Sequence, residues 1–285
     1  MKIGLSTYSL YGALQSGEMT VEDVIDYTAS IGGEHVEIVP LGYSLTDNPD
    51  LIDAIRARAE HNGLELSNYA IGANFLTDDE EQFRKEIERV KGQVDIAAKL
   101  GVSLMRHDVA SSPDVSIRHF NAQVERLAGA CREIARYAAG YGITTSVENH
   151  GYFIQQSDRV QTLVQAVGEP NFKTTLDIGN SVCADEDPLA AVPNNLPYAS
   201  IVHIKDFYIR PASQDPGEGW FRSTAGKYLR GAIVGQGDLN IRETLRLVKE
   251  SGYDGYLSLE FEGMEPCRDG ARIGLANLRR FWNEI

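Results

Sequence analysis

Three acidic residues and one histidine in the second half of the chain each lie near the end of a short apolar run. The four runs read TTSVENHG, TTLDIGN, SIVHIKD and LSLEFEG, and they supply Glu148, Asp177, His203 and Glu260. A carboxylate in an apolar segment needs a partner charge, because burial otherwise raises its pKa until it becomes neutral. Lys205 could offset one of them, but no Lys or Arg is placed by sequence to cancel all three. The set therefore predicts a divalent-cation site.

The ligand types narrow the choice of metal. Three carboxylates and one imidazole make a hard, mainly oxygen-based set, which suits Mn²⁺, Mg²⁺ or Co²⁺, with Zn²⁺ as a further option. We expect Mn²⁺. The three cysteines, Cys131, Cys183 and Cys267, are widely spaced and form no CxxC pair. Free thiols in a reducing cytoplasm fit that pattern.

The four runs belong to an alternation that extends through the chain. Short segments rich in β-branched and aromatic residues alternate with longer segments of helical periodicity. We expect strands at Lys2–Thr7, His35–Pro40, Leu64–Ala70, Ser103–Asp108, Thr144–Asn149, Lys173–Asp177, Ser200–Lys205 and Tyr256–Glu262. The expected helices include Val21–Ser30, Pro49–His61, Asp79–Leu100, Ser116–Gly140, Asp158–Val167 and Ile241–Ser251.

Eight repeats of strand and helix predict a single (β/α)8 TIM barrel over residues 1–285, whose strand ends would all open onto one face. A doubly wound open sheet is the alternative, but the segment LSTYSLYGALQSG matches a glycine-rich phosphate turn poorly. The stretch Ile209–Gly237 is rich in Gly, Pro and Ser, and we expect a long loop there. It is either a lid or part of a binding site, or else a plain surface insertion.

The charge balance argues against two classes of partner. The chain has 27 basic and 41 acidic residues, a formal net charge of -14. Such an excess of acid opposes binding to nucleic acid or to an anionic membrane surface. No apolar run approaches the roughly 18 residues of a spanning helix, and MKIGLSTYSL does not read as a signal peptide. We therefore expect a cytoplasmic protein.

Several segments resemble one known family. They are VENH (147–150), LDIGN (176–180), HIKD (203–206), VGQGDLNIRETL (234–245) and GYDGYLSLEFEG (252–263). The chain is similar along its length to the xylose-isomerase-like superfamily of TIM barrels, and within it to the sugar (phosphate) isomerase/epimerase group. The resemblance implies one barrel with one divalent metal held by Glu148, Asp177, His203 and Glu260. It also implies a homo-oligomer, commonly a dimer or tetramer.

The resemblance further implies a reaction on a small keto-sugar or polyol. Members of the family remove a proton from the carbon beside a carbonyl group, and the metal stabilises the resulting enediolate. In the ketose 3-epimerases of the family, the two glutamates act as acid and base on opposite faces of the sugar. That implies this role for Glu148 and Glu260.

Neighbouring residues are further candidates. His150 would share the face of Glu148 if its strand continued, as a general base or a substrate partner, or else lie outside the site. Lys205 shares the face of His203 by the same alternation, and it could bind a substrate hydroxyl or carboxylate or merely offset the carboxylates. Asp206 could orient a metal-binding side chain without contacting the metal itself. The Gly235–Gly237 loop could bind a phosphate weakly.

Alternation leaves other residues undecided. On the fourth strand, either His107 or the pair Arg106 and Asp108 faces the pocket as a substrate contact, and Glu37 could face the pocket or the helices. Five aromatic residues could form a wall for a sugar ring, although packing is the commoner role for each: Tyr8, Tyr69, Phe153, Trp220 and Phe221.

One position departs from the family pattern. Several ketose epimerases carry a histidine where this chain has Asn180, and an amide can bind a substrate hydroxyl but cannot shuttle a proton. Together with Glu148 and His150, this favours an alternative: a lyase that acts on a keto-sugar, such as an inosose-type dehydratase or a C-glycoside-cleaving enzyme. The apurinic-site endonucleases share the barrel, but six histidines and a charge of -14 oppose that function. A non-catalytic barrel should have lost a ligand, and all four are present.

Overall fold

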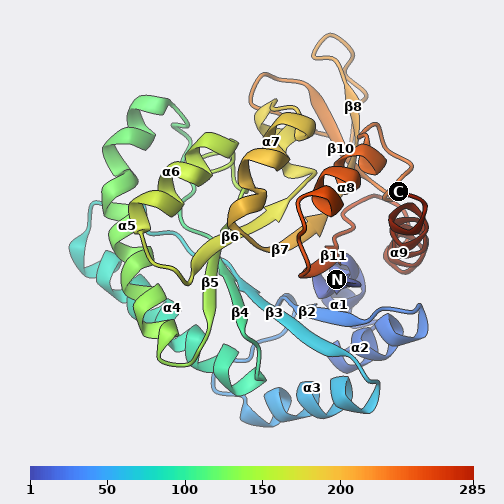
Figure 1. The fold of residues 1–285 in the computed structure, drawn as a ribbon, viewed down its shortest axis with the longest axis horizontal. Coiled ribbons are helices and arrows are strands. Elements are labelled where there is room, and N and C mark those ends of the chain that lie inside the picture. Colours follow the sequence, from blue (N-terminus) through green and yellow to red (C-terminus); the bar gives the residue numbers. More distant parts are fainter.

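Eight parallel strands form a closed barrel in the computed structural model, which describes all 285 residues (Figure 1). Around the barrel the order is β1-β11-β7-β6-β5-β4-β3-β2. The predicted (β/α)8 barrel is therefore confirmed, and the open sheet is excluded. The strands are β1 (Lys2–Ser6), β2 (His35–Ile38), β3 (Glu65–Ile71), β4 (Leu104–His107), β5 (Thr144–Glu148), β6 (Phe172–Asp177), β7 (Ala199–Ile204) and β11 (Tyr256–Leu259).

The main helices surround the barrel, and their ends follow local sequence signals. The side chain of Thr20 caps one helix together with Asp23 in a capping box, and Gly101 ends another at φ 78°. Two predicted helices have the expected bounds, three differ only in their cap residues, and the helix at Ser157–Val167 begins one residue earlier than predicted. The helices are α1 (Tyr11–Ser16), α2 (Val21–Ser30), α3 (Pro49–His61), α4 (Glu80–Leu100), α5 (Ile117–Ala139), α6 (Ser157–Val167), α7 (Pro188–Asn195), α8 (Ile241–Glu250) and α9 (Cys267–Glu284).

The stretch predicted as one long loop contains regular structure. It holds most of a three-stranded antiparallel sheet, in which β10 (Tyr228–Ala232) pairs with β8 (Asp206–Arg210) and with β9 (Phe221–Arg222). Figure 1 shows this sheet extending away from the barrel beside α8. The prediction of a structureless loop is wrong, because the pairing joins segments about 20 residues apart and leaves little local pattern.

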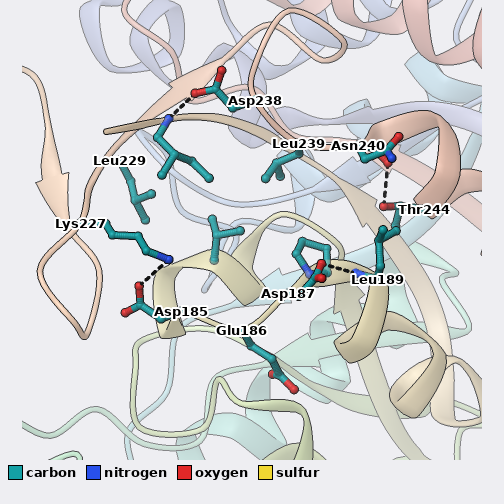
Figure 2. A pocket seen from close by; sticks show the side chains of 13 residues that line it. Asp185, Glu186, Asp187, Leu189, Lys227, Leu229, Asp238, Leu239, Asn240 and Thr244 are labelled. Atoms are coloured by element: carbon teal, nitrogen blue, oxygen red, sulfur yellow. Dashed lines mark hydrogen bonds and ion pairs between the residues drawn. The ribbon is translucent and has the colours of Figure 1, made fainter. Parts of the chain in front are cut away.

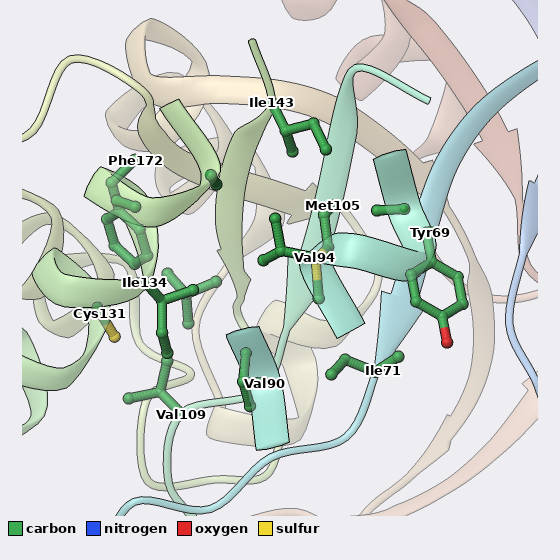
Figure 3. Packing of buried hydrophobic residues seen from close by; sticks show 14 of the residues in the cluster. Tyr69, Ile71, Val90, Val94, Met105, Val109, Cys131, Ile134, Ile143 and Phe172 are labelled. Carbon is green, nitrogen blue, oxygen red and sulfur yellow. The ribbon is translucent and has the colours of Figure 1, made fainter. Parts of the chain in front are cut away.

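The hydrophobic core lies mainly between the strands and the helices. One cluster packs α4 and α5 against β3 to β6 and includes Ile134, Leu127 and Phe172, which are almost wholly buried (Figure 3). A second cluster packs α8 and α9 against β1, β7 and β11. Burial of this apolar surface is the main source of stability for such a fold. No helix in the structure is both long enough and apolar enough to cross a membrane.

The inside of the barrel is polar rather than apolar. Ser146 and Thr175 lie 2.8 Å apart there, and the imidazole of His35 contacts Ser67 at 2.9 Å. A Cβ atom on Gly4 would lie 2.1 Å from the carbonyl oxygen of His35. Glycine therefore lets β1 approach β2 closely around this buried imidazole. A polar interior continues directly into the polar mouth of the barrel.

Candidate active site

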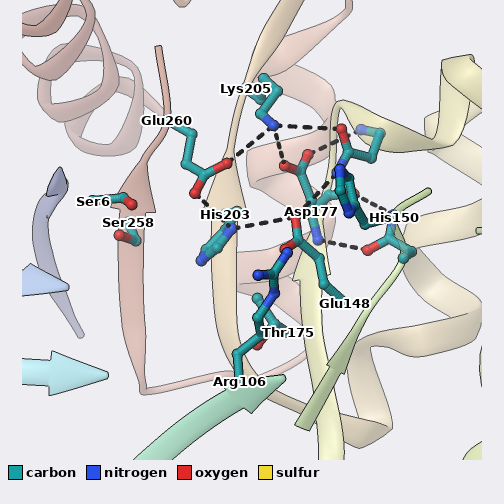
Figure 4. A network of polar contacts seen from close by, with 12 residues as sticks. Ser6, Arg106, Glu148, His150, Thr175, Asp177, His203, Lys205, Ser258 and Glu260 are labelled. Atoms are coloured by element: carbon teal, nitrogen blue, oxygen red, sulfur yellow. Dashed lines mark hydrogen bonds and ion pairs between the residues drawn. The ribbon is translucent and has the colours of Figure 1, made fainter. Parts of the chain in front are cut away.

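Four side chains meet at the C-terminal mouth of the barrel. Glu148 and Asp177 are the last residues of β5 and β6, His203 is next to last in β7, and Glu260 follows β11. One ligand atom from each lies within 4.8 Å of all the others, and all four residues are buried (Figure 4). The strand register explains part of this convergence. Asp177 on β6 and Ser258 on β11 both lie opposite His203 on β7, and Glu260 is two residues after Ser258. This buried cluster could hold a metal ion.

Cations lie beside every carboxylate of the cluster. Arg106 on β4 forms an ion pair with Glu148, and the ammonium of Lys205 lies 3.3 Å from Asp177 and 3.0 Å from Glu260. Lys205 thus contacts two of the carboxylates rather than one, and Arg106 contacts the third, but two cations do not neutralise all three. Arg106 is 42 residues before Glu148, so no local pattern connects the two.

These contacts set the ionisation of the metal-free cluster. Burial alone would raise the pKa of Glu148, but the Arg106 guanidinium and the His203 imidazole hold it well below its usual range. Burial raises the pKa of Asp177 to about 6, and Lys205 offsets only part of that effect. Burial disfavours the charged form of Lys205, but Glu262 and Asp177 keep its pKa well above the ordinary value. The lysine is therefore cationic and the site strongly charged.

Two buried atoms in the cluster lack a hydrogen-bond partner. They are Nδ1 of His203 and Oδ2 of Asp177. The imidazole nitrogen lies 3.6 Å from a Glu148 oxygen and 3.4 Å from a Glu260 oxygen, so it faces the centre of the cluster. Buried polar atoms are normally satisfied, and unsatisfied ones at a convergence of carboxylates suit a divalent cation. The donor set therefore fits a metal ion.

Glu37 on β2 holds the other side of the histidine. Its carboxylate is fully buried, lies 2.9 Å from Nε2 of His203, and accepts hydrogen bonds from Asn68 and Ser258, both at 2.8 Å. A carboxylate in this place favours a proton on Nε2 and leaves the lone pair of Nδ1 free for a ligand. The alternative that Glu37 faces the helices is wrong. A register shift between Val36 and Glu37 hid its orientation from the alternation pattern.

Glu148, His203 and Glu260 line one pocket of about 360 Å³, and neighbouring polar residues line it with them. The strand does not continue to His150 as expected, because β5 ends at Glu148. His150 nevertheless lines the same pocket as Glu148. Its Nδ1 lies 3.5 Å from Asp108, which in turn pairs with Arg106 at 3.0 Å. Asn180 donates a hydrogen bond to Glu148 at 3.1 Å. Lys205 also faces this pocket.

His107 does not belong to the pocket. It is fully buried beside Phe75 and Phe172 in the layer between strands and helices, and its Nδ1 lies 2.9 Å from the Asp108 carbonyl oxygen. The structure thus excludes His107 as a substrate contact and selects the alternative pair, Arg106 and Asp108. The phase of the alternation on β4 is set by its pairing with β3 and β5, which the strand's own sequence does not reveal.

The predicted aromatic wall is only partly present. Tyr8 and Phe221 line the pocket. The hydroxyl of Tyr69 instead donates to Gln93 on α4, and Phe153 packs on Phe120. Trp220 lies between two arginine side chains of the inserted sheet.

Sequence reasoning missed three residues that line the pocket, namely Tyr152, Gln155 and Glu262. Glu262 lies 3.3 Å from Lys205 and accepts a hydrogen bond from Tyr8 at 3.2 Å. Its position two residues after Glu260 would have signalled a shared face by alternation. Tyr152 carried no such signal, because its backbone has a positive φ of 65° in the loop after β5.

Asp206 has a structural contact rather than a place in the pocket. Its carboxylate accepts hydrogen bonds from the backbone N–H groups of Gly235 and Gly237, each at 2.9 Å. The interpretation of Asp206 as a residue that orients a ligand is therefore not supported. The same bonds use the N–H groups of the Gly235–Gly237 loop that a phosphate would need.

A second pocket of about 330 Å³ lies outside the barrel mouth, between α7, α8 and the inserted sheet (Figure 2). Its acidic residues already have partners. Asp185 pairs with Lys227 at 3.3 Å, Asp187 caps α7 through the N–H of Leu189, and Asp238 pairs with Arg210 at 2.9 Å. The chemistry of the protein therefore concentrates in the barrel mouth.

Known proteins share this architecture. A human protein described as "Putative hydroxypyruvate isomerase" is 25% identical over 141 residues, which are 50% of this chain and 42% of that protein. The chain thus spans less than half the length of that relative. An Escherichia coli structure titled 3-keto-D-glucoside 4-epimerase, YcjR, is 16% identical with a TM-score of 0.74, over 98% of this chain and 99% of that one.

A structure of the IOLI protein with a bound zinc atom has a TM-score of 0.76 at 15% identity, over 100% of this chain and 97% of that chain. At such identities the two solved structures show the fold alone. The family model for the xylose isomerase-like TIM barrel matches residues 25–281, nearly the whole chain. The chain therefore belongs to the xylose isomerase-like TIM barrel family.

Proposed function

We propose that the protein is a divalent-metal-dependent isomerase or epimerase of a small keto-sugar or polyol. The observation that carries the proposal is the buried convergence of Glu148, Asp177, His203 and Glu260 around an unpartnered imidazole nitrogen. Mn²⁺ is the ion we propose, since three carboxylates and one imidazole form a mainly oxygen-based set. When bound, a divalent ion would stabilise negative charge that develops on a carbonyl oxygen.

The two glutamates are the proposed acid and base. Both line the pocket, and each has one oxygen near Nδ1 of His203 and another held by a cation. Arg106 holds Glu148 and Lys205 holds Glu260, so the two carboxylates are anchored separately. One can take a proton from a carbon beside a carbonyl group while the other returns a proton.

His150 and Asn180 complete the proposed site. Asn180 orients Glu148 through its amide and keeps a polar group toward the pocket. His150, beside Asp108, has a half-exposed imidazole that can exchange a proton with substrate or solvent. Lys205 and Arg106 fix the carboxylates and border the space for the sugar.

Solvent exchange tests the proposal. The Mn²⁺-loaded protein is incubated with ketoses and 3-keto sugars in D₂O, and products are followed by NMR and mass spectrometry. Incorporation of one deuterium without any other change of mass is the expected result. Glu148→Gln and Glu260→Gln should each lower the exchange rate by about 10²-fold or more. Full turnover by both variants would refute the assigned roles, and loss of water or an aglycone would instead indicate the lyase reaction.

A further inference from the structure

The pocket above the cluster carries an excess of negative charge. Five carboxylates surround the pocket, whereas only two side chains with a permanent positive charge lie there. A divalent ion added to this set would still leave more negative than positive charge. The carboxylates are Asp108, Glu148, Asp177, Glu260 and Glu262, and the cations are Arg106 and Lys205.

Both cations are already engaged. An ammonium group has three N–H donors, and that of Lys205 lies within 3.3 Å of three carboxylates, those of Asp177, Glu260 and Glu262. One terminal nitrogen of Arg106 contacts both Asp108 and Glu148, and the other donates to a backbone carbonyl at 3.3 Å. The Nε atom of Arg106 is buried beyond reach of a ligand. Both cations are therefore held by carboxylates of the pocket, which outnumber them.

Two sets of backbone N–H groups near the cluster also donate to internal carboxylates. Those of Gly235 and Gly237 donate to Asp206. Those of Gly179 and Asn180, at the turn after β6, donate to Asp177 at 2.7 and 2.9 Å. Phosphate sites in proteins are commonly built from such N–H groups, and here an internal carboxylate takes the place of the phosphate in both.

We propose that the substrate of this pocket is uncharged, a neutral ketose or polyol rather than a sugar phosphate or a carboxylic acid. The inference rests on the proposed function, because it names the substrate class of that same site. His150, the remaining titratable base of the pocket, lies 3.5 Å from Asp108. Besides the charged side chains, the groups that line the pocket, such as Asn180, Tyr8 and Phe221, are neutral. They suit hydroxyl groups and the apolar face of a sugar ring. The human relative is named for hydroxypyruvate, an acid, so this chain differs from it in substrate charge.

Matched pairs of compounds test the inference. The Mn²⁺-loaded protein is titrated with D-fructose and D-fructose 6-phosphate, with D-xylulose and D-xylulose 5-phosphate, and with dihydroxyacetone and hydroxypyruvate. Binding is read from the Mn²⁺ EPR spectrum, and deuterium exchange is measured in the same samples. The neutral member of each pair that binds should do so roughly tenfold or more tightly than the charged one, since like charges repel in the pocket.

A charge variant sharpens the test. Glu262→Gln removes one negative charge beside Lys205, so the preference for the neutral member should fall several-fold. Glu60→Gln is the matched control, because it makes the same charge change on an exposed position of α3 away from the mouth. It should leave the preference unchanged.

The outcomes separate the two proposals. A charged member that binds as tightly as its neutral partner overturns the inference on substrate charge. Neutral members that bind but exchange no hydrogen overturn the proposed reaction and leave the inference standing. If no compound of either kind perturbs the EPR spectrum, both proposals fail.

Discussion

Replacing Glu37 with glutamine should weaken metal binding without unfolding the protein. Glutamine has the same shape, and with its oxygen in the place of Oε2 it can still accept from Ser258 and from Nε2 of His203. Its amide then faces Asn68, whose unpartnered Oδ1 can accept from it once the Asn68 amide turns over. The charge that faces Nε2 of His203 at 2.9 Å is lost. A hydrogen bond to a charged acceptor contributes about 1.5–3 kcal/mol and one to a neutral acceptor about 0.5–1.5 kcal/mol. The difference of about 1–2 kcal/mol corresponds to a 5- to 30-fold loss of affinity.

Isothermal titration of the metal-free protein with Mn²⁺ measures this loss. The absorption spectrum of the Co²⁺-loaded protein reports in addition whether the ligand geometry changes. Glu186→Gln is a suitable control, because Glu186 also accepts from an internal group, the N–H of Ser157 at 2.8 Å, but lies outside the cluster. If Glu37→Gln binds Mn²⁺ within twofold of the unmodified protein and keeps the Co²⁺ spectrum, Glu37 does not position the histidine.

Three further changes have definite expected results. Burial raises the pKa of Asp177 to about 6, and the carboxylates of Glu37 and Glu260 raise the pKa of His203. Metal binding should therefore release protons, and the affinity for the metal should increase as the pH rises through about 6. Titration calorimetry in buffers of different ionisation enthalpy measures both effects. A flat affinity between pH 5 and 8 would contradict this. Arg106→Met should destabilise the metal-free protein by about 3–5 kcal/mol in urea unfolding, because Glu148 loses its buried partner; an unchanged midpoint would show that solvent already shields that carboxylate. Gly4→Ala should cost about 1–3 kcal/mol by the same assay, since its Cβ would overlap the next strand, and a neutral result would mean that β1 can shift freely.

The inserted sheet shows why one part of the fold escaped prediction. The segment around Tyr228 has strand-forming residues, but its partners in β8 and β9 are separated from it by turns rich in Gly and Pro. Pairing of this kind depends on contacts between distant segments, so the local composition indicated only a loop. For a related reason, the sequence did not show which predicted aromatic residues line the pocket. Phe221 lines it and belongs to β9, which pairs with β10.

The gathering of Glu148, Asp177, His203 and Glu260 could be predicted because it follows from topology. In a parallel barrel all strands run the same way, so residues near their C-terminal ends share one face wherever they stand in the chain. Residue type and position near a strand end were sufficient, and the exact strand bounds were not needed. The buried setting of the carboxylates likewise followed from the apolar residues before them.

Most residues that contact these four side chains could be identified only from the folded structure. Arg106 and Glu37 meet the cluster because strand register and a local shift in β2 turn them inward, and a change of one residue in register would turn them outward. The place of Lys205, by contrast, followed from its alternation with His203. Register depends on the packing of neighbouring strands, which no single segment encodes. Residue order therefore specified the chemical groups and the end of the barrel where they collect. Packing determined which charges lie beside one another, and with that the ionisation of the site.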